Sequence, residues 1–414
     1  MARPYARKTF LTQAPNELLR QYLATKGLGR GIPWSHLHEK ATDDIERAIE
    51  GGPKRTQDGI DGDFRKINDM ADEGGVRALI MEGHDPHHDG GMDLAPLANS
   101  APSRLHFAFQ IFLAHPDVFR AAHDLHSADA VSQTRWRRRG DLQGYKPDTT
   151  KAGATRLGRR LSDYYMLRDG RGKYCHVDHW KRDDKLYWFA HPEDYGQAPL
   201  EYDEQHELTP QPQRPVFDVI FQYCPARGWL DLLAPGDKER RQDLQRFFGE
   251  EILRAKLPRQ DTEPVMYELD SLMDRHFPLP TEADDGVETV KVKRLRLRVI
   301  GAAKRTITLE ADSLTDPRAV YGMLDDLLAN SDLGAEALQL TAVGLQLIFR
   351  PNERGKRRTL SFDVGYPNAC SLHDGHPLHD VARKLLQRWG IDVSERTRPG
   401  PSPRRRAVQR GLDV

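Results

Sequence analysis

The stretch Lys291-Val292-Lys293-Arg294-Leu295-Arg296-Leu297-Arg298-Val299 repeats every two residues, which is the period of a β-strand. Its three arginines fall on one face of such a strand, and its leucines and last valine fall on the other. The two lysines are out of step with the arginines, so we expect a β-bulge between Lys293 and Arg294. The stretch predicts a strand with a hydrophobic core on one side and a basic surface on the other.

The last third of the chain alternates β-hairpins with helices. Antiparallel hairpins covered by helices are typical of an α+β domain and argue against a doubly wound parallel sheet. The expected elements are strands at about 290–300 and 304–311, a helix at 316–328, a hairpin at 338–350 and 356–364, and a helix at 377–389.

The middle of the chain shows the same pattern. Alternating residues predict one hairpin over 174–190 and a second over 216–233, whose turn is Pro225-Ala226-Arg227-Gly228. Asp237 is expected to cap a helix that runs to about Leu253.

In the first third of the chain, apolar residues recur at intervals of three and four residues, which predicts helices. Ser103 is expected to cap one helix, and Gly74-Gly75 is expected to end another that carries Ile60 and Phe64 on its apolar face. We therefore predict an α+β fold with a helical N-terminal domain followed by antiparallel β-hairpins covered by helices. The predicted divisions are a helical domain (1–130), a basic linker and helix (131–172), two hairpin domains (173–280 and 281–393) and a disordered Arg-rich tail (394–414).

Opposite charges are equally numerous but unevenly placed. The 414 residues include 62 Lys and Arg and 62 Asp and Glu, and this balance excludes a uniformly basic, histone-like protein. The mean hydropathy is -0.70. Residues 39–93 carry 15 acids and 7 basic residues, residues 135–173 carry 12 basic residues and 4 acids, and residues 291–305 carry 7 basic residues and no acid. No apolar run is long enough for a transmembrane helix, and three scattered cysteines indicate a reducing, cytoplasmic setting.

The basic segments suggest nucleic-acid binding, because arginine binds phosphate bidentately and neighbouring aromatic rings stack on bases. The alternatives are ion pairing within the protein and, for the strand at 291–299, protection of a sheet edge against aggregation. If the turn at 350–358 lies beside that strand, the two form a groove that follows a phosphate backbone. The candidate residues are Arg137, Arg138, Arg139, Arg159, Arg160, Arg294, Arg296, Arg298, Arg357 and Arg358.

Two segments have the composition of a divalent-metal site. The glycine-rich loop at 83–93 offers His84, His87, His88 and Asp89 as ligands, although it lacks the helical spacing of a zinc protease motif, and the alternative is a polar exposed loop. Carboxylates near Asp194, together with Asp178 and Asp218, are candidates for a Mg²⁺ site. Phosphate-binding, dinucleotide-binding and serine-hydrolase motifs are absent from the sequence.

Three segments together, residues 60–69, 174–195 and 214–221, resemble a family of bacterial cytoplasmic proteins associated with mobile and anti-phage defence gene clusters. The resemblance implies a defence or nucleic-acid context and assigns no catalytic residue. We expect a non-enzymatic protein that binds DNA or RNA, or an accessory subunit beside a partner protein. The alternatives are a metal-dependent hydrolase or nuclease and a protein–protein assembly module.

Overall fold

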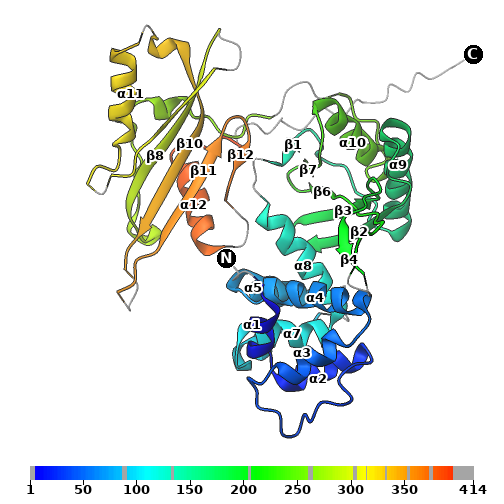
Figure 1. The fold of residues 1–414 in the computed structure, drawn as a ribbon. Coiled ribbons are helices and arrows are strands. Elements are labelled where there is room, and N and C mark those ends of the chain that lie inside the picture. Colours follow the sequence, from blue (N-terminus) through cyan, green and yellow to red (C-terminus); the bar gives the residue numbers. More distant parts are fainter. Residues whose placement is uncertain are drawn as a thin grey trace, which may run out of the picture. The chain divides into compact units, whose positions relative to one another are not determined.

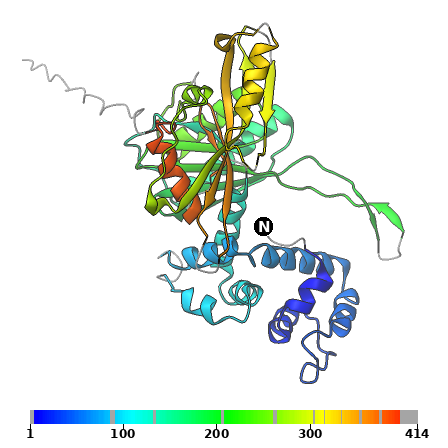
Figure 2. The ribbon, with the colours of Figure 1, turned by 90° about the vertical axis from the view of Figure 1, so that its left-hand side faces the viewer.

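The computed structural model describes residues 5–85, 91–131, 135–203, 207–259, 264–301, 305–313, 315–331, 333–351, 355–372 and 376–394. Two compact units make up the chain: Met1–Val131 with Asp141–Arg259, and Ser132–Gly140 with Gln260–Val414. Helices fill the N-terminal part and antiparallel sheets follow, as Figures 1 and 2 show, so the predicted α+β class is confirmed. None of the helices described combines the length and the apolar character needed to cross a bilayer.

The N-terminal helices of the first unit enclose a core of their own. Phe10 stacks on Phe64 with ring centroids 4.3 Å apart, and the Tyr22 hydroxyl donates a 2.7 Å hydrogen bond to Asp63. Every helix except the sixth contributes buried side chains to this core, and Leu97 and Ala98 of the sixth helix pack against it. The helices are α1 (Arg7–Gln13), α2 (Asn16–Thr25), α3 (Asp43–Glu50), α4 (Lys54–Asp69), α5 (Glu73–Gly83), α6 (Ala95–Ser100), α7 (Arg104–Ala114) and α8 (Pro116–Ala130).

Gly74 and Gly75 do not end a helix, contrary to the prediction. Helix α4 stops at Asp69, and both glycines lie in the first turn of α5. Asp72 caps α5 by accepting a 2.8 Å hydrogen bond from the Gly75 amide, so an N-cap outweighs the low helix propensity of glycine. The predicted cap at Ser103 is confirmed, since its hydroxyl accepts from the His106 amide.

The rest of the first unit is an antiparallel sheet packed against two helices. The strand order includes β7-β6-β3-β2, and both predicted hairpins of this region are confirmed. Buried residues of α9 and α10 meet one face of this sheet in a second core. The elements are α9 (Lys151–Asp169), β2 (Cys175–Arg182), β3 (Lys185–Pro192), β4 (Leu200–Tyr202), β5 (Leu208–Pro210), β6 (Val219–Cys224), β7 (Trp229–Leu233) and α10 (Lys238–Glu251).

Asp148 ties the start of α9 to the end of α10. Its carboxylate accepts hydrogen bonds from the Thr150 hydroxyl (2.6 Å), from the Thr150 amide (3.0 Å) and from the guanidinium of Arg156. Its own amide donates to the carbonyl of Ile252 at 2.8 Å. The bond from the Thr150 hydroxyl, followed by those from the Thr150 amide and Arg156, holds the pKa of Asp148 well below its ordinary value.

The second unit is built around a five-stranded antiparallel sheet of order β12-β11-β10-β8-β9. Helices α11 and α12 contribute to the core on one face of this sheet (Figure 1). The elements are β1 (Arg137–Arg139), η2 (Asp270–Met273), η3 (Ala283–Asp285), β8 (Val287–Val299), β9 (Thr306–Glu310), α11 (Val320–Ala329), η4 (Ala335–Ala337), β10 (Leu338–Phe349), β11 (Thr359–Gly365), β12 (Ala369–Cys370) and α12 (Pro377–Arg388).

The bulge predicted in β8 is present. Arg294 pairs with Gly344 of β10, but the next pair along is Val292 with Leu345, so Lys293 is an extra residue in β8. Leu295 and Leu297 are fully buried, whereas Arg296 and Arg298 are exposed. The predicted division of this strand into a core face and a basic face is therefore confirmed.

We predict that Gly158→Ala destabilises the protein although alanine is the better helix former. A Cβ atom at this position of α9 would lie 2.7 Å from the Cys175 carbonyl oxygen of β2, so helix and strand must separate. We expect a loss of about 1–3 kcal/mol in the free energy of unfolding, measured by urea denaturation. Gly62→Ala in α4 is the control: its Cβ meets no atom within 4 Å, and we expect a gain of about 0.5–1 kcal/mol. Equal gains in both variants would contradict the close approach of α9 to β2.

A second prediction concerns acid stability. Because the folded pKa of Asp148 lies below its unfolded value, its contribution to stability is complete above the unfolded pKa and falls as the pH drops through about 4 towards the folded pKa. Asp148→Asn should cost about 1–3 kcal/mol at pH 7 and less at pH 3, measured as urea midpoints at both pH values. Asp163→Asn, on the exposed side of α9, should leave both midpoints unchanged. A loss for Asp148→Asn that is the same at both pH values would contradict this assignment.

Candidate functional site

The candidate site is the face of the C-terminal sheet that lies opposite its core. Here β8 is flanked by β9 and β10, and its three arginines stand at every second residue. Arg296 is paired with Thr308 and Ala342, and Arg298 with Thr306 and Gln339. We call the row Arg294, Arg296 and Arg298 the arginine face. Its repeat of about 6.7 Å along the strand is close to the separation of successive phosphates in a nucleic-acid strand.

Arg294 is neutralised within the sheet. Its guanidinium makes an ion pair with Asp363 of β11, and the two residues lie on either side of Gly344 in the intervening strand. A Cβ atom on Gly344 would be 3.0 Å from the Cβ of Arg294 and 3.2 Å from an Asp363 carboxylate oxygen. Glycine at this position therefore leaves room for the ion pair to cross β10.

The positive charges of Arg296 and Arg298 are not neutralised by a described acidic side chain. The Arg298 guanidinium donates a hydrogen bond to the side-chain oxygen of Gln339, which is uncharged. Among the residues that the structure describes, no ion pair involves Arg296 or Arg298, and both are exposed. The hydroxyl-bearing residues opposite them on β9, Thr306 and Thr308, are exposed as well. Two positive charges and two potential hydroxyl donors are thus available on one face of the sheet.

The lysines of the same strand are engaged elsewhere. Lys291 is buried and its Nζ donates to the carbonyl of Ser313 at 2.8 Å. Lys293 lies 2.9 Å from Asp312, and this hydrogen bond is the main cause of the lowered pKa of the Asp312 carboxyl. Both lysines therefore hold the segment that follows β9 against β8.

The basic turn between β10 and β11 lies at the far end of the same sheet. Arg357 makes a 3.3 Å ion pair with Glu288, and Arg358 is exposed. Glu288 is six residues before Arg294 in β8, so Arg357 is roughly 20 Å from the arginine face along the strand. A groove between this turn and the arginines of β8, as predicted from the sequence, would have to extend over those roughly 20 Å, about six residues of strand.

The basic segment at 135–173 is largely engaged in contacts within the protein. Arg160 is 3.6 Å from Glu250 and its guanidinium lies 4.4 Å from the ring centroid of Phe247, whereas Arg159 is exposed. Arg139 is buried, with 2% of its surface exposed. Arg138 donates to the sulfur of Met266 at 2.9 Å, and Arg137 donates to the Trp136 carbonyl at 2.8 Å.

The structure describes only some of the candidate metal ligands. Within the described ranges, no group of three or more His, Cys, Asp or Glu side chains is arranged to hold an ion. Nε2 of His84 is 3.5 Å from Asp93, while His87, His88 and Asp89 lie outside the described residues.

The carboxylates proposed for a Mg²⁺ site each have a basic partner. Asp194 is 2.6 Å from Arg171, Asp178 is 3.3 Å from His176, and Asp218 is 2.9 Å from His191. The contact with Arg171 is the main cause of the lowered pKa of Asp194, and the hydrogen bond to Asp218 is the main cause of the raised pKa of His191. Each of these three carboxylates therefore contacts its own basic side chain, and the contacts do not link the carboxylates to one another.

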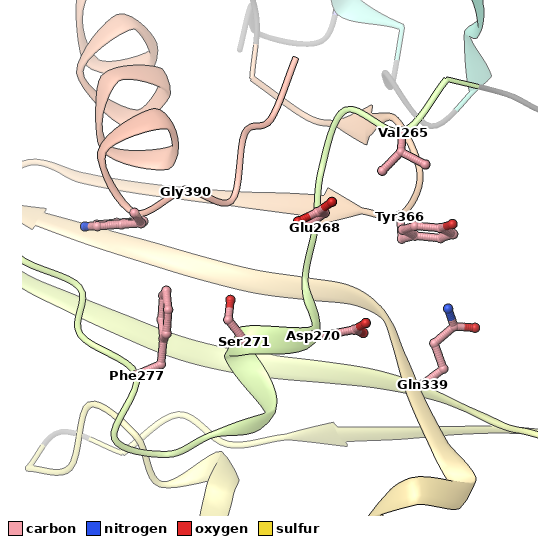
Figure 3. A pocket seen from close by; sticks show the side chains of 9 residues that line it. Val265, Glu268, Asp270, Ser271, Phe277, Gln339, Tyr366 and Gly390 are labelled. Atoms are coloured by element: carbon pink, nitrogen blue, oxygen red, sulfur yellow. The ribbon is translucent and has the colours of Figure 1, made fainter. Parts of the chain in front are cut away.

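A cavity that sequence reasoning did not predict adjoins the arginine face. It has a volume of about 560 Å³ and lies wholly in the second unit (Figure 3). Its lining comes from separate segments: the loop that enters η2, the start of β10, the end of β11 and the end of α12. The residues are Val265, Glu268, Asp270, Ser271, Phe277, Gln339, Tyr366, Trp389 and Gly390.

The polar groups of this cavity are mostly accessible. Glu268, Asp270 and Ser271 are exposed, and 42% of the surface of Tyr366 is exposed. The Asp270 carboxylate extends towards the side of the cavity where the Gln339 amide lies (Figure 3). No periodic pattern links these residues in the sequence, and only the folded sheet brings them together.

No protein-family model matches this chain, and a search of curated proteins finds no match either.

Proposed function

We propose that this protein binds nucleic acid, and that the arginine face of the C-terminal sheet is its phosphate-binding surface. The observation that carries the proposal is the pair of exposed arginines, Arg296 and Arg298, for which the described part of the chain shows no ion pair. Glu310 is the one carboxylate of β9 on this face, and it lies opposite Arg294. Arginine binds phosphate oxygens through two parallel hydrogen bonds, and partial dehydration costs it less than it costs lysine.

The surroundings of the two arginines favour a backbone ligand over a single small anion. The charges repeat along β8, and neighbouring positions on β9 carry threonine hydroxyls that can donate to phosphate oxygens. A single anion would be favoured by a concave site, whereas these residues form a row on a sheet. The association with a defence system and a partner protein remains a prediction from the resemblance.

We predict that the double variant Arg296→Ala/Arg298→Ala weakens binding to single-stranded oligonucleotides. Each phosphate contact with a single strand adds about 0.7 to the slope of log affinity against log salt, so the slope should decrease by about 1.4. The measurement is fluorescence anisotropy with labelled dT and U 20-mers over a range of salt concentrations. The control is Arg47→Ala/Arg120→Ala, which removes two exposed arginines of α3 and α8 that pair with acids in their own helices.

Three results of this experiment are decisive. A smaller slope in the double variant and an unchanged slope in the control support the proposal. Equal losses in both variants would mean that binding follows net charge and not this face. Absence of binding by the unmodified protein at low salt would remove the proposal altogether.

A complementary variant should increase affinity. Asp363→Asn removes the charge that neutralises Arg294, so a third arginine of the row becomes available to phosphate. We expect tighter binding at low salt and a slope larger by about 0.7 in the same anisotropy assay. Asp117→Asn in α8, which frees Arg120 in the other unit, is the matched control and should change neither quantity. A decrease in affinity for Asp363→Asn would contradict a phosphate-binding role for the row.

A further inference from the structure

The cavity is joined to the arginine face through one side chain. Gln339 lines the cavity, and its side-chain oxygen accepts the hydrogen bond from Arg298. A ligand that contacts Arg298 and enters the cavity therefore presents an anionic group and, close to it, a group suited to the cavity wall. A nucleotide has this composition, since its phosphate and its base are separated only by the sugar.

The cavity offers acceptors to its ligand. Glu268 and Asp270 are exposed carboxylates, and the described part of the chain shows no side-chain hydrogen bond or ion pair to either. Ionised carboxylates only accept hydrogen bonds. Guanine is the base whose Watson–Crick edge carries two adjacent donors, N1–H and the N2 amino group, whereas adenine and cytosine each offer a single amino group and thymine and uracil a single N–H.

The walls of the cavity suit a flat ring. The exposed ring of Tyr366 stands at its rim, and Phe277 and Trp389 line its interior. The Trp389 indole is held by a 2.9 Å hydrogen bond from its Nε1 to the Pro280 carbonyl. A volume of about 560 Å³ lies within the range of small-ligand sites and admits a base with its sugar.

From these contacts we infer that the cavity binds a guanine base, with the adjoining phosphate on Arg298. Asp270 accepts from the Watson–Crick edge and Tyr366 stacks on the ring. The inference rests on the proposed function, because it uses Arg298 as a phosphate contact. A cationic side chain would satisfy the two carboxylates but would be repelled by Arg298, so the arginine favours a nucleotide. The source is either a guanine within a strand or a free guanine nucleotide.

The experiment compares labelled oligo-dT 11-mers with and without a single central dG, using the full chain. We expect the dG strand to bind roughly tenfold more tightly, as one bidentate contact to a base allows. Asp270→Asn should abolish that preference, so that the two strands bind this variant with equal affinity. Asp326→Asn, an exposed position on α11, is the matched control and should keep the preference. Replacing dG by deoxyinosine, which lacks the N2 amino group, tests the same contact without altering the protein.

A second arm identifies the source. If free dGMP, and not dTMP, raises the melting temperature of the unmodified protein but not that of Asp270→Asn, the cavity accepts the free nucleotide. A dG preference without any dGMP effect assigns the site to a strand. Equal affinity for both strands together with no dGMP effect would overturn the inference and leave the proposed function standing. The salt dependence of oligo-dT binding tests that function separately.

Discussion

The core of the second unit depends on which side chains of β8 point to each face of the sheet. Val290 and Val292 occupy even positions, and Leu295, Leu297 and Val299 occupy odd ones, so a regular strand would send these two groups to opposite faces. The extra residue at Lys293 reverses the phase, and both groups then meet the core shared with α11 and α12. The same reversal puts all three arginines on the opposite face. Core formation and the basic surface therefore have one structural cause.

Charge compensation decides which basic residues are available to a ligand. Exposed ion pairs contribute little to stability, about 0–1 kcal/mol each. Their effect on the surface is larger, because each pair cancels a charge that a polyanion would otherwise meet. Arg160 and Arg294 are compensated in this way, whereas Arg296 faces threonine and alanine. The most basic stretch of the sequence, 135–173, is for this reason less accessible to a ligand than its composition indicates.

Sequence reasoning succeeded where the signal is local. Alternation in β8, the turn residues of the hairpins and the cap at Ser103 are each specified within a few residues, and the structure confirms them. It failed at Gly74-Gly75, where the competing signal was the cap supplied by Asp72. Sequence reasoning could not predict the ion pair between Arg294 and Asp363, which are 69 residues apart. It could not predict a cavity lined by separate segments either. Such features depend on sheet order, which local patterns do not specify.

In the function proposed above, the arginine face and the cavity would divide recognition between them. Contacts to phosphates supply affinity that depends on salt and is indifferent to sequence, whereas contacts to a base edge supply discrimination. Arg296 would have only the first role, because its neighbours on β9 and β10 are threonine and alanine. Arg298 would take part in both, since Gln339, which accepts its hydrogen bond, also lines the cavity. Removing Arg298 should therefore weaken binding to every strand and also loosen Gln339, whereas removing Asp270 should abolish the choice of base.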